Sequence, residues 1–335
     1  MPKHVTMQMI ADALNTTKNT VSQALSGKPG VSEETRRKII ECAERMGYRY
    51  QQKQSVVQRG YIGLVATESV IQHSGFFAEI YLGIEKELKA RGFHLLVNTI
   101  QQEQVEQLVL PPFITNSDVD AVIVLSQLDK AYLKKLETSG IPCILVDHHY
   151  PGCKMDCVLT NNRYGAYQAV EQLIELGHSA IGFIGSVDQS PSYMERYEGY
   201  LTCLREHNIT AQESFMLLKH SHTEAEFTRY LDSLGEYPTA WFCSNDMSAF
   251  LLMQNLSKRG IVVPEDVSIC GFDDIPLASM CHPSLTTMRI DRVHFCERVV
   301  DKLFWRLAHK TDPAEEILLP AELILRNSTR ITKHS

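Results

Sequence analysis

The chain has 335 residues, a formal net charge of −7 and 44% hydrophobic residues, enough for two or three domains with a sizeable core. No apolar run approaches the length of a membrane span and no basic, apolar leader opens the chain, so we expect a cytoplasmic protein with no membrane partner. The nine cysteines are scattered, and the spacing His148-His149-x-x-x-Cys153-x-x-x-Cys157 matches no zinc pattern. We therefore expect reduced core thiols and neither a metal nor a cofactor.

Charge is distributed unevenly along the chain. Residues 1–60 hold ten Lys/Arg and five Asp/Glu, a net charge of +5, whereas residues 61–335 hold 23 and 35, a net charge of −12. A basic segment joined to an acidic one is expected when the basic segment meets phosphate. A solvated basic face is the alternative, and charge alone does not exclude it.

Three short helical patterns with short connections occupy residues 1–47. The first has an N-cap candidate at Thr6, and its apolar residues recur at i, i+3, i+4 and i+7 from Met7. Asn15 follows where the chain must turn, and asparagine tolerates the left-handed conformation. Ser32 caps the third pattern, which stops at Gly47. This arrangement predicts a helix-turn-helix unit.

The second helical pattern, capped by Thr16 or Thr17, presents polar side chains at its N-terminal half. A helix fits the major groove, where Lys can donate to guanine and Asn or Gln can pair with adenine. Hydroxyls and helix N-terminal amides can reach phosphates. The predicted DNA-backbone contacts are Thr6, Thr17, Thr20, Ser22, Ser32 and Thr35. A three-helix protein-docking module is the alternative.

Several motifs of this first segment are shared with a known family. Thr20-Val-Ser22, Val31-Ser-x-x-Thr-Arg36 and Gly47-Tyr48 resemble the DNA-binding head of the LacI/GalR repressors. Asn15 replaces the glycine that is usual at the turn. By this resemblance the base-reading side chains are Lys18, Asn19 and Gln23.

The linker at residues 48–60 departs from the pattern of that family. The family's hinge helix folds on operator DNA and wedges a leucine into the minor groove, but this segment is shorter and lacks the Pro-Asn and Ala-x-x-Leu elements. Val56 or Val57 is the candidate wedge. A polar, glutamine-rich linker without a wedge is the favoured interpretation.

From Tyr61 onward, apolar runs alternate with helical patterns that end in glycine. The glycines are Gly92, Gly140, Gly177 and Gly260, and a strand-like apolar run soon follows each of them. Glycine supplies the left-handed residue that ends a helix, and near-continuous apolar strands predict parallel sheets covered on both faces. We therefore expect an α/β body of two doubly wound sheets.

Candidate ligand groups follow the predicted strands, because ligands of open α/β sheets bind beyond the carboxyl ends of the strands. The predicted effector-binding residues are Phe76, Phe77, Ser126, Asp147, Arg196, Phe242, Asn245, Asp246 and Asp273. Asp246 can instead be only a helix cap, and the phenylalanines can be core residues. Asp273 and Arg196 are the hardest to explain as scaffold. Nothing singles out Thr67 and Glu68, which follow the first strand.

The resemblance to the LacI/GalR family extends across the body, through Glu195-Arg196-Tyr-Glu-Gly199, Ser244-Asn245-Asp246, Gly271-Phe-Asp-Asp274 and Pro283-Ser-Leu-Thr-Thr287. It implies a periplasmic-binding-protein-like body whose effector cleft lies between two subdomains and whose first subdomain supplies a dimer surface. The expected division is a head at 1–47, a linker at 48–60, an N-subdomain at 61–160 and 291–320, and a C-subdomain at 161–290 and 321–335.

These patterns predict a transcriptional regulator, a repressor by family analogy. We expect a homodimer that binds a near-palindromic, double-stranded operator and is switched by a small effector, a sugar or sugar derivative. One alternative is a sugar-binding protein with weak or no operator specificity. Another is an enzyme that uses Asp273 with His282, or the His148-His149 loop, for acid–base chemistry. Because we find no Ser/His/Asp set, phosphate loop or dinucleotide fingerprint in context, we expect no enzymatic activity.

Overall fold

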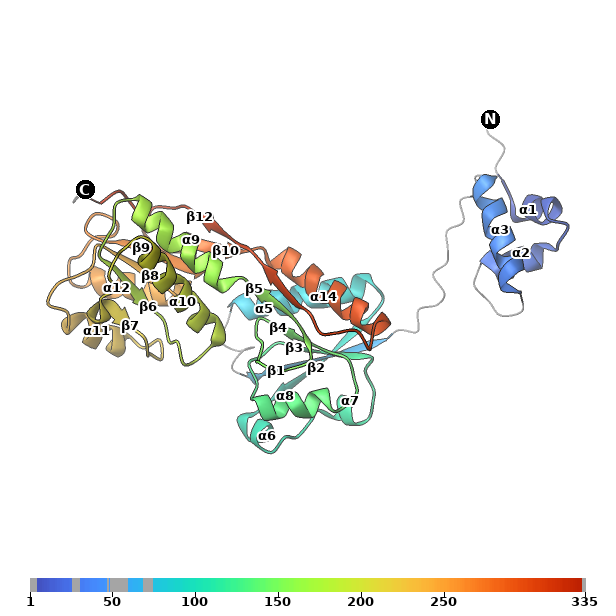
Figure 1. The fold of residues 1–335 in the computed structure, drawn as a ribbon, viewed down its shortest axis with the longest axis horizontal. Helices are drawn as coiled ribbons and strands as arrows, with labels where there is room; N and C mark the ends of the chain where they lie inside the picture. The colour runs from blue at the N-terminus through green and yellow to red at the C-terminus, as the bar shows by residue number, and fades with distance from the viewer. Residues whose placement is uncertain (1–4, 26–30, 47, 49–59, 69–74, 333–335) are drawn as a thin grey trace. The chain divides into compact units, whose positions relative to one another are not determined.

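The computed structural model describes residues 5–25, 31–46, 48, 60–68 and 75–332. It divides into two compact units, residues 1–60 and residues 61–335 (Figure 1). Most of the linker lies outside the described residues, including the candidate wedge residues Val56 and Val57.

The first unit is the predicted three-helix head, with α1 at Met7–Ala13, α2 at Lys18–Leu25 and α3 at Glu33–Arg45. Asn15 has a φ of 49°, so it takes the left-handed conformation expected at the turn between α1 and α2. Thr17 caps α2, because its Oγ1 accepts from the Thr20 backbone N–H at 3.1 Å. The apolar core consists of Ile10, Ala11, Val21, Ala24, Leu25, Ile39, Cys42 and Ala43.

The second unit contains two six-stranded sheets. The first sheet has the order β11-β5-β4-β3-β1-β2 and all its paired strands are parallel: β1 Tyr61–Thr67, β2 His94–Ile100, β3 Ala121–Val124, β4 Cys143–Val146, β5 Asp156–Thr160 and β11 Glu316–Leu319. The second has the order β12-β10-β9-β8-β6-β7: β6 Ile181–Ile184, β7 Met216–Leu217, β8 Ala240–Cys243, β9 Ser268–Asp273, β10 Thr286–Ile290 and β12 Ala321–Ile324. In this sheet β12 alone runs antiparallel to its neighbour.

Helices lie beside both sheets (Figure 1). We call the first sheet with its helices the first half of the body, and the second sheet with its helices the second half. In the first half they are α5 Gly75–Ala90, α6 Gln102–Glu106, α7 Pro112–Thr115, α8 Lys130–Glu137 and α14 Arg292–Ala308. In the second half they are α9 Asn162–Glu175, α10 Pro191–Glu206, the 3-10 turn η1 Glu213–Phe215, α11 Glu224–Asp232, α12 Asp246–Ser257 and α13 Pro276–Met280. Helix α9 packs along α10, and α5 packs along α14. The central strands β3, β4, β6 and β8 are buried along their whole length, as strands covered on both faces must be.

The glycines that follow the helices have the backbone conformation that the sequence requires. The φ angles are 83° at Gly92, 77° at Gly140, 88° at Gly177 and 75° at Gly260. Each is in the left-handed region, where a side chain would be strained. The predicted α/β class with two sheets and a helix-turn-helix head is therefore confirmed.

The chain moves from one sheet to the other at three places within the described part of the body. It crosses between β5 and β6, between β10 and β11, and between β11 and β12, where only residue 320 separates the two strands. Residues far apart in sequence therefore meet where the two halves adjoin. The subdomain boundaries expected from the sequence stay a prediction.

A buried ion-pair network lies within the first half. It is away from the strand ends that hold the predicted ligand groups. Asp156 in β5 is fully buried and accepts from Arg306 Nε at 2.5 Å and Nη2 at 2.9 Å. It also accepts from the Glu315 backbone N–H at 2.8 Å, and Lys302 Nζ lies 3.4 Å away. Burial acts to raise the pKa of the Asp156 carboxyl, but these hydrogen bonds and charges outweigh burial and hold the pKa below its usual range.

In the parts of the chain that the structure describes, no helix is long and apolar enough to cross a bilayer. The same residues contain no group of three or more His, Cys, Asp or Glu arranged to hold a metal ion. The buried His148 instead places its Nδ1 3.0 Å from the Val146 carbonyl oxygen.

Candidate functional sites

A cavity of about 550 Å³ lies where the two sheet-bearing halves of the body meet. The first half contributes Thr67, Phe76, Phe77, Gln102, Gln127, Asp129, Asp147 and Tyr150, and the second contributes Gln189, Ser190, Ser192, Tyr193, Arg196 and Asp273. Several of these residues end a parallel strand or follow it closely, as Thr67 does in β1, Asp147 after β4 and Asp273 in β9. The cavity is therefore at the edge where open α/β sheets bind ligands.

A buried ion pair joins two of the predicted residues in the cavity wall. Arg196 Nη1 lies 3.0 Å from Asp273 Oδ1, and the Arg196 side chain is only 3% exposed. Its Nε donates to Asn162 Oδ1 at 2.9 Å and its Nη1 donates to the Ser244 carbonyl oxygen at 2.6 Å. The guanidinium also lies 3.7 Å from the centre of the Phe272 ring. These contacts hold the guanidinium plane rigidly beside the cavity.

The two strand-end aspartates of the cavity have unusual backbone conformations. The φ angle is 59° at Asp147 and 104° at Asp273, both in the region that side chains rarely adopt. Such strain is concentrated at functional sites, where it directs a side chain that regular strand geometry would turn elsewhere. Both residues belong to the predicted set, but the left-handed geometry is visible only in the structure.

Burial changes the protonation of these carboxyls. Burial raises the pKa of Asp147 to about 7, with Arg196 and a hydrogen bond from Thr160 Oγ1 at 3.3 Å opposing the change. Burial also raises the pKa of Asp273, although the adjacent Arg196 guanidinium lowers it in part. Near neutral pH, Asp147 can thus both donate and accept hydrogen bonds.

The aromatic residues of the predicted set divide between the cavity and the core. Phe76 and Phe77 of α5 line the cavity, with their ring centres 5.2 Å apart in an edge-to-face arrangement. Phe242 lies elsewhere: it is fully buried in β8, 5.9 Å from the Phe183 ring, in the core of the second half. Its strand position turns the ring toward the packed face of the sheet and not toward the cavity.

Three further predicted residues lie behind the cavity wall. Ser126 Oγ accepts from the Thr67 backbone N–H at 2.7 Å. Asn245 caps α12 and donates from Nδ2 to the hydroxyl oxygen of Tyr193 at 2.6 Å. Asp246 is fully buried and accepts from Thr287 Oγ1 at 2.5 Å and from the Ile275 backbone N–H at 2.9 Å. Burial, with Asp273 nearby, raises the pKa of Asp246 to about 8.

Several cavity residues were missed by the sequence reasoning. They are Thr67, Gln102, Gln127, Asp129, Tyr150, Gln189, Ser190, Ser192 and Tyr193. Tyr193 precedes Arg196 by almost one helical turn, so helical spacing would have placed it on the same face. Residues 189–192 follow strand β6, and the strand-end rule applied there would have found them. Gln102 at the start of α6, Gln127 after β3 and Tyr150 after β4 also follow strand ends, so the same rule would have included them without showing which of them enter the cavity.

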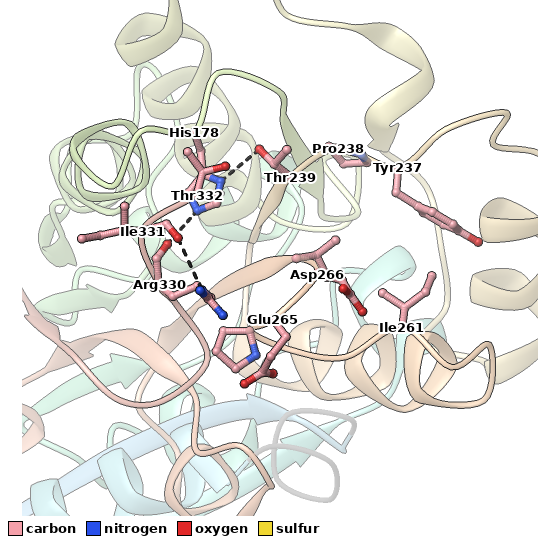
Figure 2. Close-up of a pocket in the computed structure, with 12 residues that line it drawn as sticks. His178, Tyr237, Pro238, Thr239, Ile261, Glu265, Asp266, Arg330, Ile331 and Thr332 are labelled. Atoms are coloured by element: carbon pink, nitrogen blue, oxygen red, sulfur yellow. Dashed lines mark hydrogen bonds between the residues drawn. The ribbon is translucent and has the colours of Figure 1, made fainter. Parts of the chain in front are cut away.

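A second hollow of about 360 Å³ lies at the opposite edge of the second sheet (Figure 2). It adjoins the residues that precede strands β6, β8 and β9, and its lining includes Tyr237, Glu265 and Arg330. At its base the buried His178 is 2.9 Å from Thr239 Oγ1 through Nδ1 and 3.1 Å from the Arg330 carbonyl oxygen through Nε2. None of the predicted residues lines it, and the His178 contacts tie elements of the scaffold together.

The predicted DNA-contacting residues of the head lie on α2 or at the N-terminal ends of its helices. Lys18 and Asn19 are exposed on α2, and Gln23 is half-buried one turn further along. The hydroxyls of Thr6, Thr17 and Ser32 cap the three helices, accepting from the backbone N–H groups of Met9, Thr20 and Thr35 at 3.4, 3.1 and 3.3 Å. Arg36 Nη1 donates to the Ala24 carbonyl oxygen at 2.8 Å and so joins α3 to the end of α2.

A helix-turn-helix head followed by an α/β body with a polar cavity between two sheets defines a DNA-binding regulator with a ligand-binding domain. Comparison with known families agrees with this class. Residues 6–51 match the model described as bacterial regulatory proteins, lacI family. Residues 170–329 match the model described as a periplasmic binding protein-like domain.

Full-length relatives identify the family. The chain is 30% identical to the "Probable HTH-type transcriptional repressor ExuR" of Bacillus subtilis (strain 168), over 97% of this chain and 98% of that protein. It is 26% identical, with a TM-score of 0.70, to a LacI family regulator from Enterococcus faecium solved with bound ribose, over 82% of this chain and 100% of that one. The lac repressor dimer bound to operator and the anti-inducer ONPF has the same fold, with a TM-score of 0.71 at 22% identity, over 98% of this chain and 100% of that one. The chain belongs to the LacI family of bacterial regulatory proteins.

The family membership confirms the resemblance seen in the sequence and the prediction of a DNA-binding transcriptional regulator. The relative from Bacillus subtilis is named as a repressor, and repressors are not enzymes, which agrees with the prediction that this chain has no enzymatic activity.

Proposed function

We propose that this protein is a ligand-responsive repressor that binds a near-palindromic operator as a homodimer and is switched by a carbohydrate in the cavity between the two halves of the body. The observation that carries the proposal is the cavity itself, in which the Arg196–Asp273 pair, other polar side chains and the Phe76–Phe77 pair come together. Amides, hydroxyls and carboxyls suit the hydroxyls of a sugar, and aromatic rings suit its apolar face.

The charge of the cavity supports an uncharged, hydroxyl-rich ligand. Among the described residues that line it, Arg196 is the one Lys or Arg side chain, and its charge already meets Asp273 at 3.0 Å. Asp129 and Asp147 add acidic groups. A phosphate would meet carboxylates without a spare cation, whereas a polyol can donate to each of them.

Switching follows from the position of the cavity. A ligand that contacts residues of both halves binds best when the two halves are closed around it, so it shifts the body toward that conformation. The effect on operator binding is then a difference in affinity between two conformations, with a coupling free energy of about 1–3 kcal/mol typical of such systems. We propose the subdomain division at 61–160 with 291–320 and 161–290 with 321–335, and a cytoplasmic location.

For the head we propose that Lys18, Asn19 and Gln23 contact base edges. The capping residues Thr17 and Ser32 place helix N-termini, with their exposed N–H groups, where they can meet phosphates. A second head on the partner subunit would read the other half-site, since two-fold protein symmetry imposes a symmetric operator.

Electrophoretic mobility shifts with operator fragments selected from random DNA test the DNA-binding part. Gln23→Ala and Asn19→Ala should each weaken binding to the selected site by about 1–3 kcal/mol and relax its specificity. Gln8→Ala is the matched control, since among the described residues exposed Gln8 on α1 bonds only to Asp12 of its own helix, at 2.8 Å. Binding that is indifferent to sequence would contradict the proposal.

A thermal-shift screen tests the ligand part. Neutral mono- and disaccharides, uronates and sugar phosphates are compared as ligands of the full chain, because a ligand that binds the native state raises its stability by mass action. We expect neutral sugars to stabilise the protein most, and a sugar that does so should change the mobility shift. Stabilisation by phosphates alone would overturn the proposed ligand class.

A further inference from the structure

The loop between β7 and α11, at residues 218–223, carries two buried or half-buried histidines, His220 and His222. It follows strand β7 at the same edge of the second sheet that bears the cavity, yet neither histidine lines the cavity. The two rings lie 4.5 Å apart, edge to face. The polar contacts of this loop connect it to two parts of the cavity wall.

The backbone of His220 holds the segment that follows strand β6. The His220 N–H donates to Ser186 Oγ at 2.8 Å, and the Ser186 hydroxyl donates to the His220 carbonyl oxygen. Gln189, which lines the cavity, donates from Nε2 to the same carbonyl oxygen at 2.9 Å. The loop therefore braces one part of the cavity wall through its main chain.

The ring of His222 reaches a second part of the wall through Asn245. His222 Nε2 is 3.4 Å from Asn245 Nδ2 and 3.1 Å from Ser248 Oγ. The orientation of the Asn245 amide is determined by its capping role, since its Oδ1 accepts from the Ser248 backbone N–H at 2.7 Å. The reverse orientation would set an amide NH2 group against that N–H.

This orientation assigns the proton of His222. An amide NH2 group only donates, so Nε2 of His222 has to accept and must be unprotonated, which leaves the proton of the neutral ring on Nδ1. The same Asn245 NH2 group donates to the Tyr193 oxygen at 2.6 Å. Because that oxygen accepts from Asn245, the Tyr193 proton points elsewhere, and the described residues offer it no acceptor.

Tyr193 belongs to the cavity wall, and the Arg196 guanidinium lies 5.8 Å from the centre of its ring. We propose that His222 is a positioning residue of the cavity: as a neutral imidazole it holds Asn245, which orients the Tyr193 hydroxyl to donate to a ligand oxygen. Protonation of His222 at Nε2 sets two donors against each other, breaks the contact with Asn245 and releases Tyr193. The consequence for sugar binding rests on the proposed function, whereas the chain of hydrogen bonds does not.

The charged and titratable groups around His222 determine the pH at which its ring becomes protonated. His220 faces the ring within the loop, and Glu226 of α11 accepts from the Ser221 N–H at 2.9 Å and from Thr223. Lys219 pairs with Asp188 at 3.4 Å near the surface, and Asp273 and Asp147 act on Tyr193 from the cavity side. Burial is the largest influence on the pKa of His222 and lowers it, so the contact persists at neutral pH and is lost in acid.

The first test needs no ligand. Full-length protein with ¹⁵N-labelled histidine and Tyr ¹³Cζ labels is followed by NMR from about pH 8 to about pH 4, a range that extends well below the usual histidine pKa because the pKa of His222 is lowered. We expect His222 to carry its proton on Nδ1 at the high end, and the Tyr193 resonance to shift with the same midpoint as His222. Tyr200, which donates to the Ile181 carbonyl oxygen at 2.8 Å, is the control resonance and should not follow.

Two variants separate positioning from a purely structural role. His222→Asn tolerates the left-handed backbone, where φ is 54°, and should abolish the pH-linked shift of Tyr193. Asn245→Asp retains a helix cap but presents an acceptor to the ring, so His222 should become protonated at neutral pH. A His222 ring protonated on Nε2 in the wild type, or a Tyr193 resonance that ignores the His222 titration, would overturn the inference.

A second experiment measures how His222 protonation changes ligand affinity. Neutral sugars, including D-ribose and cellobiose, are tested by thermal shift and calorimetry at the high and low ends of this pH range. Any sugar that binds should bind about five- to tenfold more weakly to the wild type in acid, the value of one hydrogen bond, and His222→Asn should lack this pH dependence. An equal pH dependence in both would overturn the inference. If no sugar binds, the proposed ligand class fails while the NMR result still decides the role of His222.

Discussion

Two buried arginine–aspartate pairs, one in each half of the body, have the same chemistry and different surroundings. In the first half, Asp156 accepts two bonds from Arg306 and one from the Glu315 N–H, and Arg306 also donates to the carbonyl oxygens of His309, Asp312 and Pro313 at 2.7–2.8 Å. In the second half, Asp273 meets Arg196 at one contact and otherwise faces the cavity from a strained backbone.

The comparison shows how a scaffold pair differs from a binding pair. A carboxylate whose lone pairs are all filled by the protein has its pKa lowered, as at Asp156. A carboxyl that is buried without enough partners has its pKa raised, as at Asp273. A ligand can donate the hydrogen bonds that Asp273 does not receive from the protein. We therefore interpret the Arg196–Asp273 pair as part of the proposed binding site and the Arg306–Asp156 pair as part of the scaffold.

The largest expected effect is on the scaffold pair. Asp156→Asn should lower the free energy of unfolding by about 3–5 kcal/mol, because it leaves Arg306 as a buried charge without its counter-ion, whereas Lys302 keeps Glu315 at 2.6 Å. Urea unfolding followed by circular dichroism measures the change. A loss below about 1 kcal/mol would remove the basis of the comparison.

The binding pair should respond differently. Asp273→Asn should cost about 2 kcal/mol of stability, because Arg196 keeps its bonds to Asn162 and to the Ser244 carbonyl oxygen. The same variant should lose the thermal shift produced by any sugar that stabilises the wild type, whereas a partly destabilised Asp156→Asn protein should keep it. If both variants lost the ligand response equally, the two pairs would not differ in role.

Asp246 sharpens the comparison, because it is buried beside the cavity and carries no ion pair in the described structure. Its pKa is raised to about 8, so its protonated form contributes stability that is present below the unfolded pKa near 4 and is lost as the pH rises through about 8. Between pH 6 and pH 9 we expect the wild type to lose about 2–3 kcal/mol of unfolding free energy through Asp246, since each pH unit below the folded pKa contributes about 1.4 kcal/mol.

Asp246→Asn should flatten this pH dependence. Its amide oxygen can accept from the Ile275 N–H and its amide NH2 can donate to the Thr287 hydroxyl, so the variant should be close to the wild type at pH 6. Any slope that remains is expected from Asp147, whose pKa of about 7 has the same sign of effect. Urea unfolding of both proteins across this pH range is the measurement, and parallel curves would contradict the prediction.

The smallest effect is expected at an exposed pair. Arg91 and Asp301 lie 2.5 Å apart with side chains 32% and 45% exposed, so solvent screens their charges. Asp301→Asn should change stability by less than about 1 kcal/mol, and raising the salt concentration should reduce even that. A cost similar to that of Asp156→Asn would mean that contact distance, and not burial, controls these pairs.

Much of the fold was predictable, because its signals are local. The apolar period placed Ile10 and Ala11 in the head core, and Asn15 at the turn has the expected left-handed backbone. Glycine at the helix ends followed by apolar runs predicted two parallel sheets. For the cavity, the strand-end rule led to Asp147 and Asp273, because the carboxyl ends of parallel strands meet at one edge.

Other parts of the site could not be predicted, because they depend on contacts distant in sequence. Phe242 and Asp246 also lie at the end of strand β8, but the ring packs into the core and the carboxyl is held by Thr287 and Ile275. Gln102 at the start of α6 and Gln127 after β3 line the cavity from the first half, whereas Ser126, which follows the same strand β3, does not. Nothing in the neighbouring sequence shows whether the protein itself makes all the hydrogen bonds to a carboxyl or leaves some of its acceptor positions open to a ligand.

The sequence by itself determined the helix-turn-helix head, the α/β class and the family, since periodicity, capping residues and ordered motifs act within a few residues of one another. Only the tertiary structure decided which strand-end residues form the cavity, that Asp156 and Asp273 have opposite pKa changes, and that His222 reaches Tyr193 through Asn245. The physical reason is that the three crossings between the sheets bring distant segments together, and burial and partner number are properties of that assembly.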